Sequence, residues 1–460
     1  MSTSSSPALV RSEVRVTGAL AAIFGLRMFG LFMLLPVFAV FGASLPGATP
    51  FLIGLAVGAY GLVQALLQLP FGMLSDRFGR RPLLVIGLLL FAAGGVVAAC
   101  ADTIYGVIAG RAIQGGGAVA AVIMALVTDV ISEQHRTRAM AGIGMSVGGA
   151  FVLALILGPL LASGLGLSGL FWLSTGLALL GLLVVLVWVP DPKVRVREAQ
   201  LPLPQRLLRI IRDPLMVRLN SGIFVLHALL TASFVVIPGV LSERLGLPLP
   251  QHSLLYLVVF LASFIAMVPL IIASERRGQR PIMAISVSLL ILSLVMLALG
   301  GGKLWLIGAA LWVFFTGFNA LEALLPSLVG RAAPVGTRGT ALGIYSSCQF
   351  LGVFVGGAAG GWLLQQFGSG MVFWAAAVLC AGWLVLVLGM PPLVKLESRV
   401  LPLPVAAEQA DDWASRLLSV QGVLEAVALP EDGIALLKVA PAELDEVALA
   451  RQAEGAVTAV

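Results

Sequence analysis

This chain of 460 residues is 59% hydrophobic and only 11% charged, whereas ~25% of the residues in an ordinary soluble domain are charged. A soluble core cannot bury that much apolar surface, so the composition excludes an ordinary soluble protein. The net charge of +6 would indicate a nucleic-acid partner only if the basic residues clustered. Their placement in the chain explains the positive charge in another way.

Apolar runs dominate the first 391 residues, and about twelve of them are long enough to cross a bilayer, because a hydrocarbon core of ~30 Å needs ~20 residues of helix. The first run follows Arg11 and Arg15 but is long and is followed by further spans, so a retained helix is expected, not a cleaved signal. The predicted spans are 17–42, 51–74, 82–100, 104–128, 138–163, 168–189, 217–240, 252–273, 281–300, 304–329, 339–365 and 370–390.

An internal repeat divides these spans into two six-helix halves, 1–189 and 217–391, joined by a charged, proline-containing linker, 190–216. The segment PFGMLSDRFGRRP at 70–82 recurs 199 residues later as PLIIASERRGQRP at 269–281. LPLP follows each half, at 201–204 and at 401–404. Repeats at similar offsets indicate two related bundles, the plan of many transporters.

Basic residues alternate between loops. Before residue 405 there are 25 basic and 12 acidic residues, and 21 of the basic ones lie at the N-terminus, in alternate loops or after the last span. Only Arg244 and Lys303 lie in the other set of loops. Because short cytoplasmic loops accumulate Lys and Arg, both chain ends are predicted to be cytoplasmic in a bacterial inner membrane. The basic excess is thus a topology signal, and no nucleic-acid partner is expected.

The end of the chain has a different composition, with 3 basic and 10 acidic residues in 405–460. A linker, 392–410, and a small soluble α+β domain, 411–460, are predicted there. About 50 residues make only a marginal core, so the domain is expected to lean on the bundle or on another copy. Its predicted elements are a helix at 412–419, strands at 426–429 and 434–439 joined by a turn at 430–433, and a helix from about 442.

Neither cofactor nor metal chemistry is indicated. Cys100, Cys348 and Cys380 lie in or beside apolar spans without metal-ligand spacing, so no disulfide or metal site is expected. The sequence contains no nucleotide-binding loop, metal cluster or nucleophile triad, and the chain is therefore not expected to be an enzyme or to hold a cofactor.

Ionisable side chains deep in the spans are few, and each costs roughly 2.5–3.5 kcal/mol in a bilayer, so they are usually functional or paired. They are Arg27, Arg111, His227 and Glu322, in the first, fourth, seventh and tenth spans. This interval of three predicts that these helices surround a shared cavity. Further polar residues expected at the cavity are Tyr60, Gln64 and Gln68, on one face of the second span, and Asn319.

Glu322 is the only acid near the middle of a span. A carboxyl there can be neutral when it faces a dry or substrate-filled cavity and ionised when it faces water, as proton coupling requires. The alternative is that Glu322 only pairs with Arg27, Arg111 or His227 to pin the halves together. His227 is a candidate coupling partner because its titration lies near physiological pH, although a lone histidine is more often a packing residue.

A loop signature follows the second span, with Gly72, Asp76, Arg77, Gly79 and Arg80 in the segment GMLSDRFGRRP. The glycines allow close helix approach and a sharp turn, and the arginines can stay in cytoplasmic water. This spacing resembles the GxLaDrxGrk signature of the major facilitator superfamily. The resemblance implies that the segment is a conformational switch, a latch for the outward-open state.

Two further motifs support the resemblance. Arg111 opens RAIQGGGA, which is similar to RxxQGxGA, and Gly158-Pro159 resembles the antiporter motif gxxxGPxxGG, with Ala162 and Ser163 in place of its last two glycines. The chain thus resembles the drug:proton antiporter branch, in particular members with an appended ferredoxin-like domain. The resemblance implies twelve helices in two six-helix halves and a proton-driven exporter.

The expected partners are a small-molecule substrate, protons and the lipid bilayer, and the expected protein is a monomer that works by alternating access. Two alternatives stay open, because a fold does not set transport direction. One is a proton-coupled importer or uniporter. The other is a membrane sensor that signals through its C-terminal domain.

Overall fold

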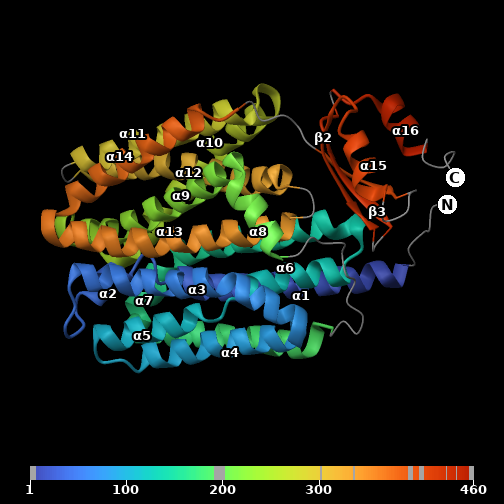
Figure 1. The fold of residues 1–460 in the computed structure, drawn as a ribbon. Helices are drawn as coiled ribbons and strands as arrows, with labels where there is room; N and C mark the ends of the chain where they lie inside the picture. The colour runs from blue at the N-terminus through green and yellow to red at the C-terminus, as the bar shows by residue number, and fades with distance from the viewer. Residues whose placement is uncertain are drawn as a thin grey trace.

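The computed structural model describes residues 7–190, 203–300, 303–334, 337–391, 397–403, 409–430, 433–441 and 443–454. Parts of both predicted linkers and of the turn at 430–433 lie outside these ranges. Eleven helices among the described residues are long and apolar enough to cross a membrane. The helices form two groups that lie side by side, α1–α7 and α9–α14, and a small domain with strands sits at one end of them (Figure 1).

The N-terminal group contains seven helices, several of which are parts of one predicted span. The first span divides into α1 and α2 at a turn, 33–37, and the fourth divides into α5 and α6 around Gly116. Conversely, α7 covers the fifth and sixth predicted spans, and its backbone leaves helical geometry at Gly166, where φ is +66°. The bounds are α1 Pro7–Phe32, α2 Phe38–Gly42, α3 Pro50–Phe78, α4 Arg80–Ala99, α5 Ile104–Gly115, α6 Val119–Val130 and α7 Glu133–Trp188.

A short helix inside the predicted linker 190–216 precedes the C-terminal group. It carries Arg206, which donates to Thr340 Oγ1 at 3.1 Å. The spanning helices follow, with a π-helical turn after the first of them. The bounds are α8 Leu203–Arg212, α9 Pro214–Gly239, η1 Val240–Arg244, α10 Leu249–Arg277, α11 Gln279–Leu299, α12 Leu304–Ala332, α13 Arg338–Phe367 and α14 Ser369–Leu388.

The sequence repeat is also a structural repeat. α3 and α10 are each 29 residues long, and each contains the proline of the repeated segment. Each ends at a glycine in the left-handed region, Gly79 at φ +103° and Gly278 at φ +87°, from which the next helix starts. A residue with a Cβ atom rarely adopts this conformation, so the glycines of the signature form the sharp turn between two long helices.

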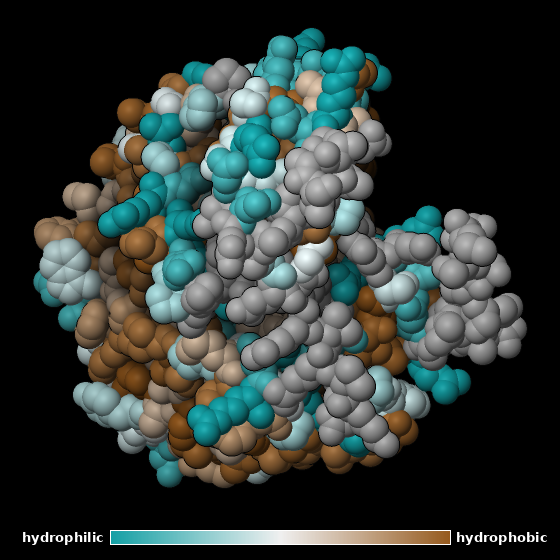
Figure 2. Space-filling model, turned by 45° about the vertical axis from the view of Figure 1, so that its right-hand side comes forward, coloured by the Kyte–Doolittle hydropathy of each residue, from teal (hydrophilic) through white to brown (hydrophobic). Residues whose placement is uncertain are grey.

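Large apolar side chains cover much of the outer surface of the helices, as a bilayer-facing surface requires (Figure 2). The helices that match the third, sixth, ninth and twelfth spans show this clearly. Examples from each are Leu89 on α4, Leu183 on α7, Leu292 on α11 and Val378 on α14, which are all exposed.

The small domain holds a three-stranded antiparallel sheet of order β1-β3-β2 and two helices. Its core contains Trp413, Leu417 and Leu437. The strand β1 lies in 392–410, which was expected to be a linker, so that expectation is wrong for 397–402. This strand ends in a proline, which an edge strand tolerates. The bounds are β1 Glu397–Pro402, α15 Ala410–Leu417, β2 Val423–Leu429, β3 Ile434–Val439 and α16 Glu446–Glu454.

Lys438 of β3 fastens this domain to the bundle. Its ammonium donates to the carbonyl oxygens of Ala332 and Ala333, at 2.5 and 2.8 Å, at the C-terminal end of α12. Cations are favourable at that end of a helix, where the last carbonyls lack partners. Burial lowers the pKa of Lys438, and the carboxylates of Glu425 and Asp213 oppose that shift.

Candidate functional site

Arg27 of α1 lies inside the N-terminal half and is fully buried. Its Nη2 donates to Tyr60 Oη at 2.6 Å, to Gln64 Oε1 at 2.9 Å and to the Gly117 carbonyl at 2.6 Å. That carbonyl lies in the break between α5 and α6. Arg27 therefore ties α1 and α3 to the broken fourth span, while its Nε and Nη1 have no partner among the described residues.

Arg111 of α5 approaches the same tyrosine from the other side, with its guanidinium carbon 5.1 Å from the ring centroid of Tyr60. Its Nη1 donates to Gln114 Oε1 at 3.1 Å, and its Nε and Nη2 reach the carbonyls of Ala56 and Val57 at 3.4 Å. The two buried arginines thus share one aromatic ring and neutral oxygens, so their charge is met here by dipoles and a ring, not by a carboxylate.

Glu322 of α12 and His227 of α9 lie together in the C-terminal half, with 4.0 Å between Glu322 Oε2 and His227 Nε2. Gln349 of α13 places its amide nitrogen 2.8 Å from the same His227 Nε2. Because an amide nitrogen donates, that contact needs a ring nitrogen without a proton, so the imidazole is neutral in this arrangement. An Nε2 atom that carries no proton cannot donate a hydrogen bond to the carboxyl group of Glu322.

The Oε2 atom of Glu322 consequently accepts no hydrogen bond from a described residue. This oxygen is buried, although 39% of the side-chain surface is accessible. An ionised oxygen that is out of water costs free energy unless it is hydrogen-bonded. The site therefore lacks one positive or donating group, which a proton or a bound cation can supply.

Aromatic rings from both halves adjoin this carboxyl group. Phe318, one turn before Glu322 on α12, lies 5.8 Å from the His227 ring and stacks on Phe151 of α7, with centroids 6.1 Å apart. Phe151 also meets Phe260 of α10 edge-on at 5.9 Å. The acidic site thus borders an apolar wall that both halves build. Close by on α12, Asn319 Nδ2 donates to Ser263 Oγ of α10 at 3.3 Å.

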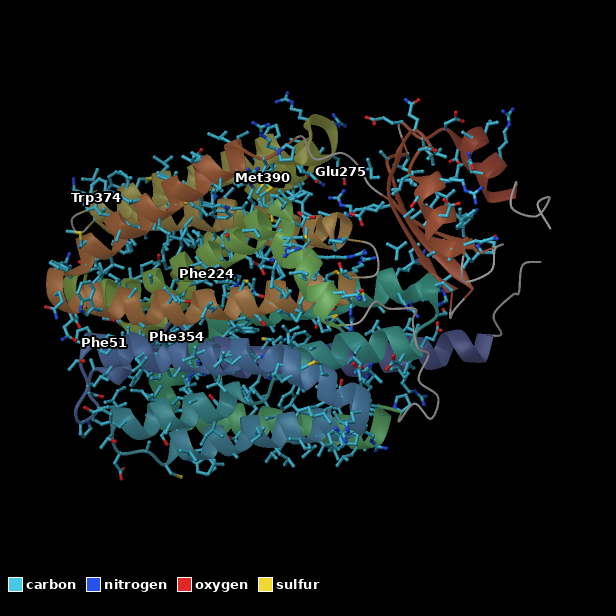
Figure 3. The ribbon with its side chains drawn as sticks, viewed as in Figure 1. Phe51, Phe224, Glu275, Phe354, Trp374 and Met390 are labelled. Carbon is cyan, nitrogen blue, oxygen red and sulfur yellow. The ribbon has the colours of Figure 1, made fainter. Side chains whose placement is uncertain are left out.

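The halves pack most closely where α3 begins and α13 ends. A methyl group on Gly54 would overlap the carbonyl oxygen of Gly357, and one on Gly58 would lie 2.8 Å from the Phe354 carbonyl oxygen. Phe51 N–H donates to Gln365 Oε1 at 3.2 Å. These contacts form a seam between α3 and α13. Figure 3 labels Phe51 at this end of the bundle and Phe354 along the seam, both far from the small domain.

The signature residues lie at the opposite end of α3. Arg80 donates from Nε to Asp129 Oδ2 at 2.7 Å and pairs with Asp76 at 2.5 Å. Its Nη1 also donates to Ser75 Oγ at 2.5 Å. Asp129 has 7% of its side-chain surface exposed and Asp76 has 65%, so Asp76 of the signature is largely exposed while the buried pair of Arg80 and Asp129 joins α4 to α6.

Other residues of the predicted switch serve close packing. Gly72 faces the Cβ atom of Ala121 at ordinary contact distance, and Arg77 lies over the ring of Phe78 at 5.5 Å. A methyl group on Gly158 would lie 2.6 Å from the carbonyl oxygen of Met33, in the break between α1 and α2. Pro159, which follows inside α7, cannot donate a backbone hydrogen bond to the helix.

Comparison with known proteins identifies the architecture. The sequence pattern of the Major Facilitator Superfamily matches residues 19–236 and again residues 219–424. The chain is 42% identical to the "Inner membrane transport protein YajR" of Escherichia coli (strain K12) over 431 residues, which are 93% of this chain and 94% of that protein. The chain belongs to the major facilitator superfamily.

More distant members of the superfamily are also similar. The "Multidrug resistance protein MdtH" of Yersinia pestis (strain Pestoides F) is 26% identical over 360 residues, which are 76% of this chain and 88% of that protein. A solved D-xylose-proton symporter shares the fold, with a TM-score of 0.66 at 17% identity, and the match covers 83% of this chain and 98% of that one. The protein is therefore a membrane-spanning transporter of the major facilitator fold.

The four ionisable residues that were expected around one cavity lie as two pairs, one in each half of the structure. Arg27 and Arg111 meet at Tyr60 in one half, and His227 and Glu322 meet in the other. Gln64 and Gln68 belong to the arginine pair, since Gln64 Nε2 donates to Gln68 Oε1 at 3.1 Å.

Sequence reasoning missed three contributors. Asp129 falls one residue beyond the predicted fourth span, so it was not counted as a membrane carboxylate. Gln349 and Phe151 carry no local signal, because a glutamine or phenylalanine in an apolar span is ordinary. Only the packing of α13 against α9, and of α7 against α10, brings these two side chains to the acidic site.

Proposed function

We propose that this transporter is a proton-coupled exporter of small drug-like molecules or metabolites in a bacterial inner membrane. One observation carries the proposal, the buried Glu322 oxygen that no described residue hydrogen-bonds, beside a His227 ring that is neutral in this arrangement. Such a carboxyl group can exchange a proton for a cationic or donating substrate group. Each ligand then shifts the balance between two conformations according to how differently it binds them.

The two-half architecture supports alternating access. The glycine seam between α3 and α13 closes one end, and the aromatic wall of Phe151, Phe260 and Phe318 joins the halves beside Glu322. Separation of the halves at the seam would expose Glu322 to the other side of the membrane. Protons entering from the acidic outer side would then favour one state, and their release to the cytoplasm would favour the other.

Twelve crossings and cytoplasmic chain ends are part of the proposal. A continuous helix of 56 residues, the length of α7, would be ~84 Å long, whereas one crossing needs ~30 Å. A reversal at Gly166 turns α7 into two crossings and gives an even count. Both ends of the chain then lie on one side, which the basic loops assign to the cytoplasm.

Export is favoured by the Gly158-Pro159 motif and by the similarity to a protein named for multidrug resistance. The apolar wall beside one carboxyl group suits a lipophilic cation. The symporter of the same fold moves its substrate together with protons, by its printed name, so the fold alone leaves import possible. Direction is therefore decided by the sign of the measured flux.

The test is proton flux in proteoliposomes with an imposed pH gradient. Purified wild type and Glu322→Gln are screened against cationic, neutral and anionic compounds. We expect cationic compounds to trigger proton movement in wild type and none to do so in the variant. The control is Glu275→Gln, an exposed acid in the same half, at the end of α10 that faces the small domain (Figure 3).

Two outcomes contradict the proposal. Equal compound-driven proton flux in Glu322→Gln and wild type would make Glu322 a structural residue. Compound binding without any flux in wild type would favour the sensor, whose output should depend on the C-terminal domain. A chain that ends at residue 391 would test this dependence, because the truncation also removes the strand β1, which belongs to that domain.

A further inference from the structure

A second polar site lies away from the transport pathway, where α1, α4, α6 and α7 meet at the end of the bundle near the small domain. It is a pocket of about 490 Å³. Two arginines, Arg15 and Arg81, line it together with Trp188 and apolar residues such as Val16 and Val130. None of the nine described residues that line it is acidic, so the pocket offers positive charge and apolar surface together.

The internal repeat supplies a comparison for this pocket. Arg81 donates from Nη2 to the carbonyl oxygen of Leu186, near the end of α7, at 2.5 Å. In the other half Arg280, 199 residues later, donates to the carbonyl oxygen of Leu388, at the end of α14, also at 2.5 Å. Both arginines thus satisfy carbonyls at the C-terminal end of the sixth helix of their half.

The first helices of the two halves differ. Arg218 of α9 donates to the carbonyl oxygen of Gly389 at 2.5 Å and so completes the cap in the C-terminal half. On α1, Ala19 stands 199 residues before Arg218, and Arg15, one turn earlier, is exposed and makes no hydrogen bond or ion pair within the described part of the chain. In the C-terminal half an arginine of the first helix thus contacts the end of the sixth helix. In the N-terminal half the guanidinium of Arg15 makes no such contact, and a pocket lies beside it.

The surroundings fit a lipid. Trp188 is 53% exposed at the rim, and aromatic residues of this kind favour the boundary between headgroups and acyl chains. Leu179, Leu180, Leu183 and Val187 are also exposed and follow one face of α7 away from the pocket, where an acyl chain can lie. Basic pockets between membrane helices bind anionic headgroups.

We propose that this pocket binds an anionic phospholipid, with Arg15 and Arg81 at the phosphate and the acyl chains along the exposed face of α7. The lipid would complete in the N-terminal half the contact that Arg218 makes in the C-terminal half. This site depends neither on the transported substrate nor on coupling to protons. It would hold α1 against the end of α7 and thus stabilise the N-terminal bundle as one body.

The experiment is native mass spectrometry of the purified full chain titrated with phosphatidylglycerol or phosphatidylcholine. We expect wild type to hold one phosphatidylglycerol more tightly than phosphatidylcholine. Arg15→Gln should weaken phosphatidylglycerol binding about fivefold, the factor that ~1 kcal/mol per arginine gives near an anionic surface. Arg218→Gln is the matched control and should leave that binding unchanged, because its arginine already has a protein partner.

Three results would overturn the proposal: equal affinity for the two lipids, equal loss in both arginine variants, or binding of inorganic phosphate alone with the same dependence on Arg15. A second measurement leaves the arginines intact. Brominated phosphatidylglycerol should quench a fraction of the fluorescence of the eight tryptophans, and Trp188→Phe should remove that fraction. Unchanged quenching in Trp188→Phe would place the lipid elsewhere and refute this site.

Discussion

Substitution of Gly54 by alanine tests how the two halves close. In the structure a methyl group at this position would overlap the carbonyl oxygen of Gly357 and lie 3.0 Å from the Cα atom of Gly361. A carbon atom normally lies ~3.3–3.6 Å from a carbonyl oxygen, so α3 and α13 have to separate by roughly 1 Å or more. Overpacking of this kind costs ~1–3 kcal/mol.

The cost acts on the equilibrium between conformations. Alanine also favours helix over glycine by ~1 kcal/mol, but α3 is helical whether the halves are closed or apart, so that gain cancels. The ratio of closed to open molecules should therefore fall between about fivefold and about 150-fold.

Pulsed EPR can measure that change. Spin labels at Ala43 and Phe367, one in each half and both exposed at this end, report the separation in a background without the native cysteines. We expect Gly54→Ala to shift the distances toward longer values. Gly148→Ala is the control, because a methyl group there meets no atom within 4 Å. An unchanged distance distribution in Gly54→Ala would refute the idea that this seam sets the closed state.

Two further predictions concern single contacts. Asp129→Asn removes the buried carboxylate that pairs with Arg80 and should lower the free energy of unfolding by ~1–3 kcal/mol, whereas Asp76→Asn removes the exposed partner and should cost ~1 kcal/mol or less. Thermal unfolding in detergent compares the two variants, and equal effects would contradict the assignment. Lys438→Met removes two charge-assisted hydrogen bonds to the end of α12 and should broaden the distribution of EPR distances between labels on α16 and α11. Arg416→Gln, on the exposed face of the same domain, is the control and should leave the distribution unchanged. An unchanged distribution in Lys438→Met would show that other contacts hold the domain.

Patterns that act over short stretches were readable from the sequence. The signature glycines predicted a sharp turn after the second span, and Gly79 takes the left-handed conformation that such a turn requires. The repeat predicted a counterpart 199 residues later, and Gly278 repeats the turn. The appended domain was predicted in its two helices and two of its strands, since turn residues and alternating apolar positions mark them.

Contacts between distant segments were not readable. The Gly117 carbonyl that accepts from Arg27 is 90 residues away, and it can accept this hydrogen bond only because the fourth span breaks there. The strand β1 was expected to be part of a linker, and only its pairing with β3 makes it part of the sheet. Local composition sets which residues enter the membrane, but helix packing decides which of them meet.

The two halves share one fold, but their buried ionisable groups differ in how many hydrogen-bond partners they have. This difference bears on the proposed mechanism. In the N-terminal half Arg27 and Arg111 donate to Tyr60, glutamines and backbone carbonyls, although Arg27 Nε and Nη1 have no partner among the described residues. In the C-terminal half the buried oxygen of Glu322 has none. A group that must gain and lose a partner in each cycle cannot also be permanently satisfied. On this reasoning the proposed exchange of proton for substrate would take place on α12, the helix whose C-terminal end accepts the hydrogen bonds of Lys438.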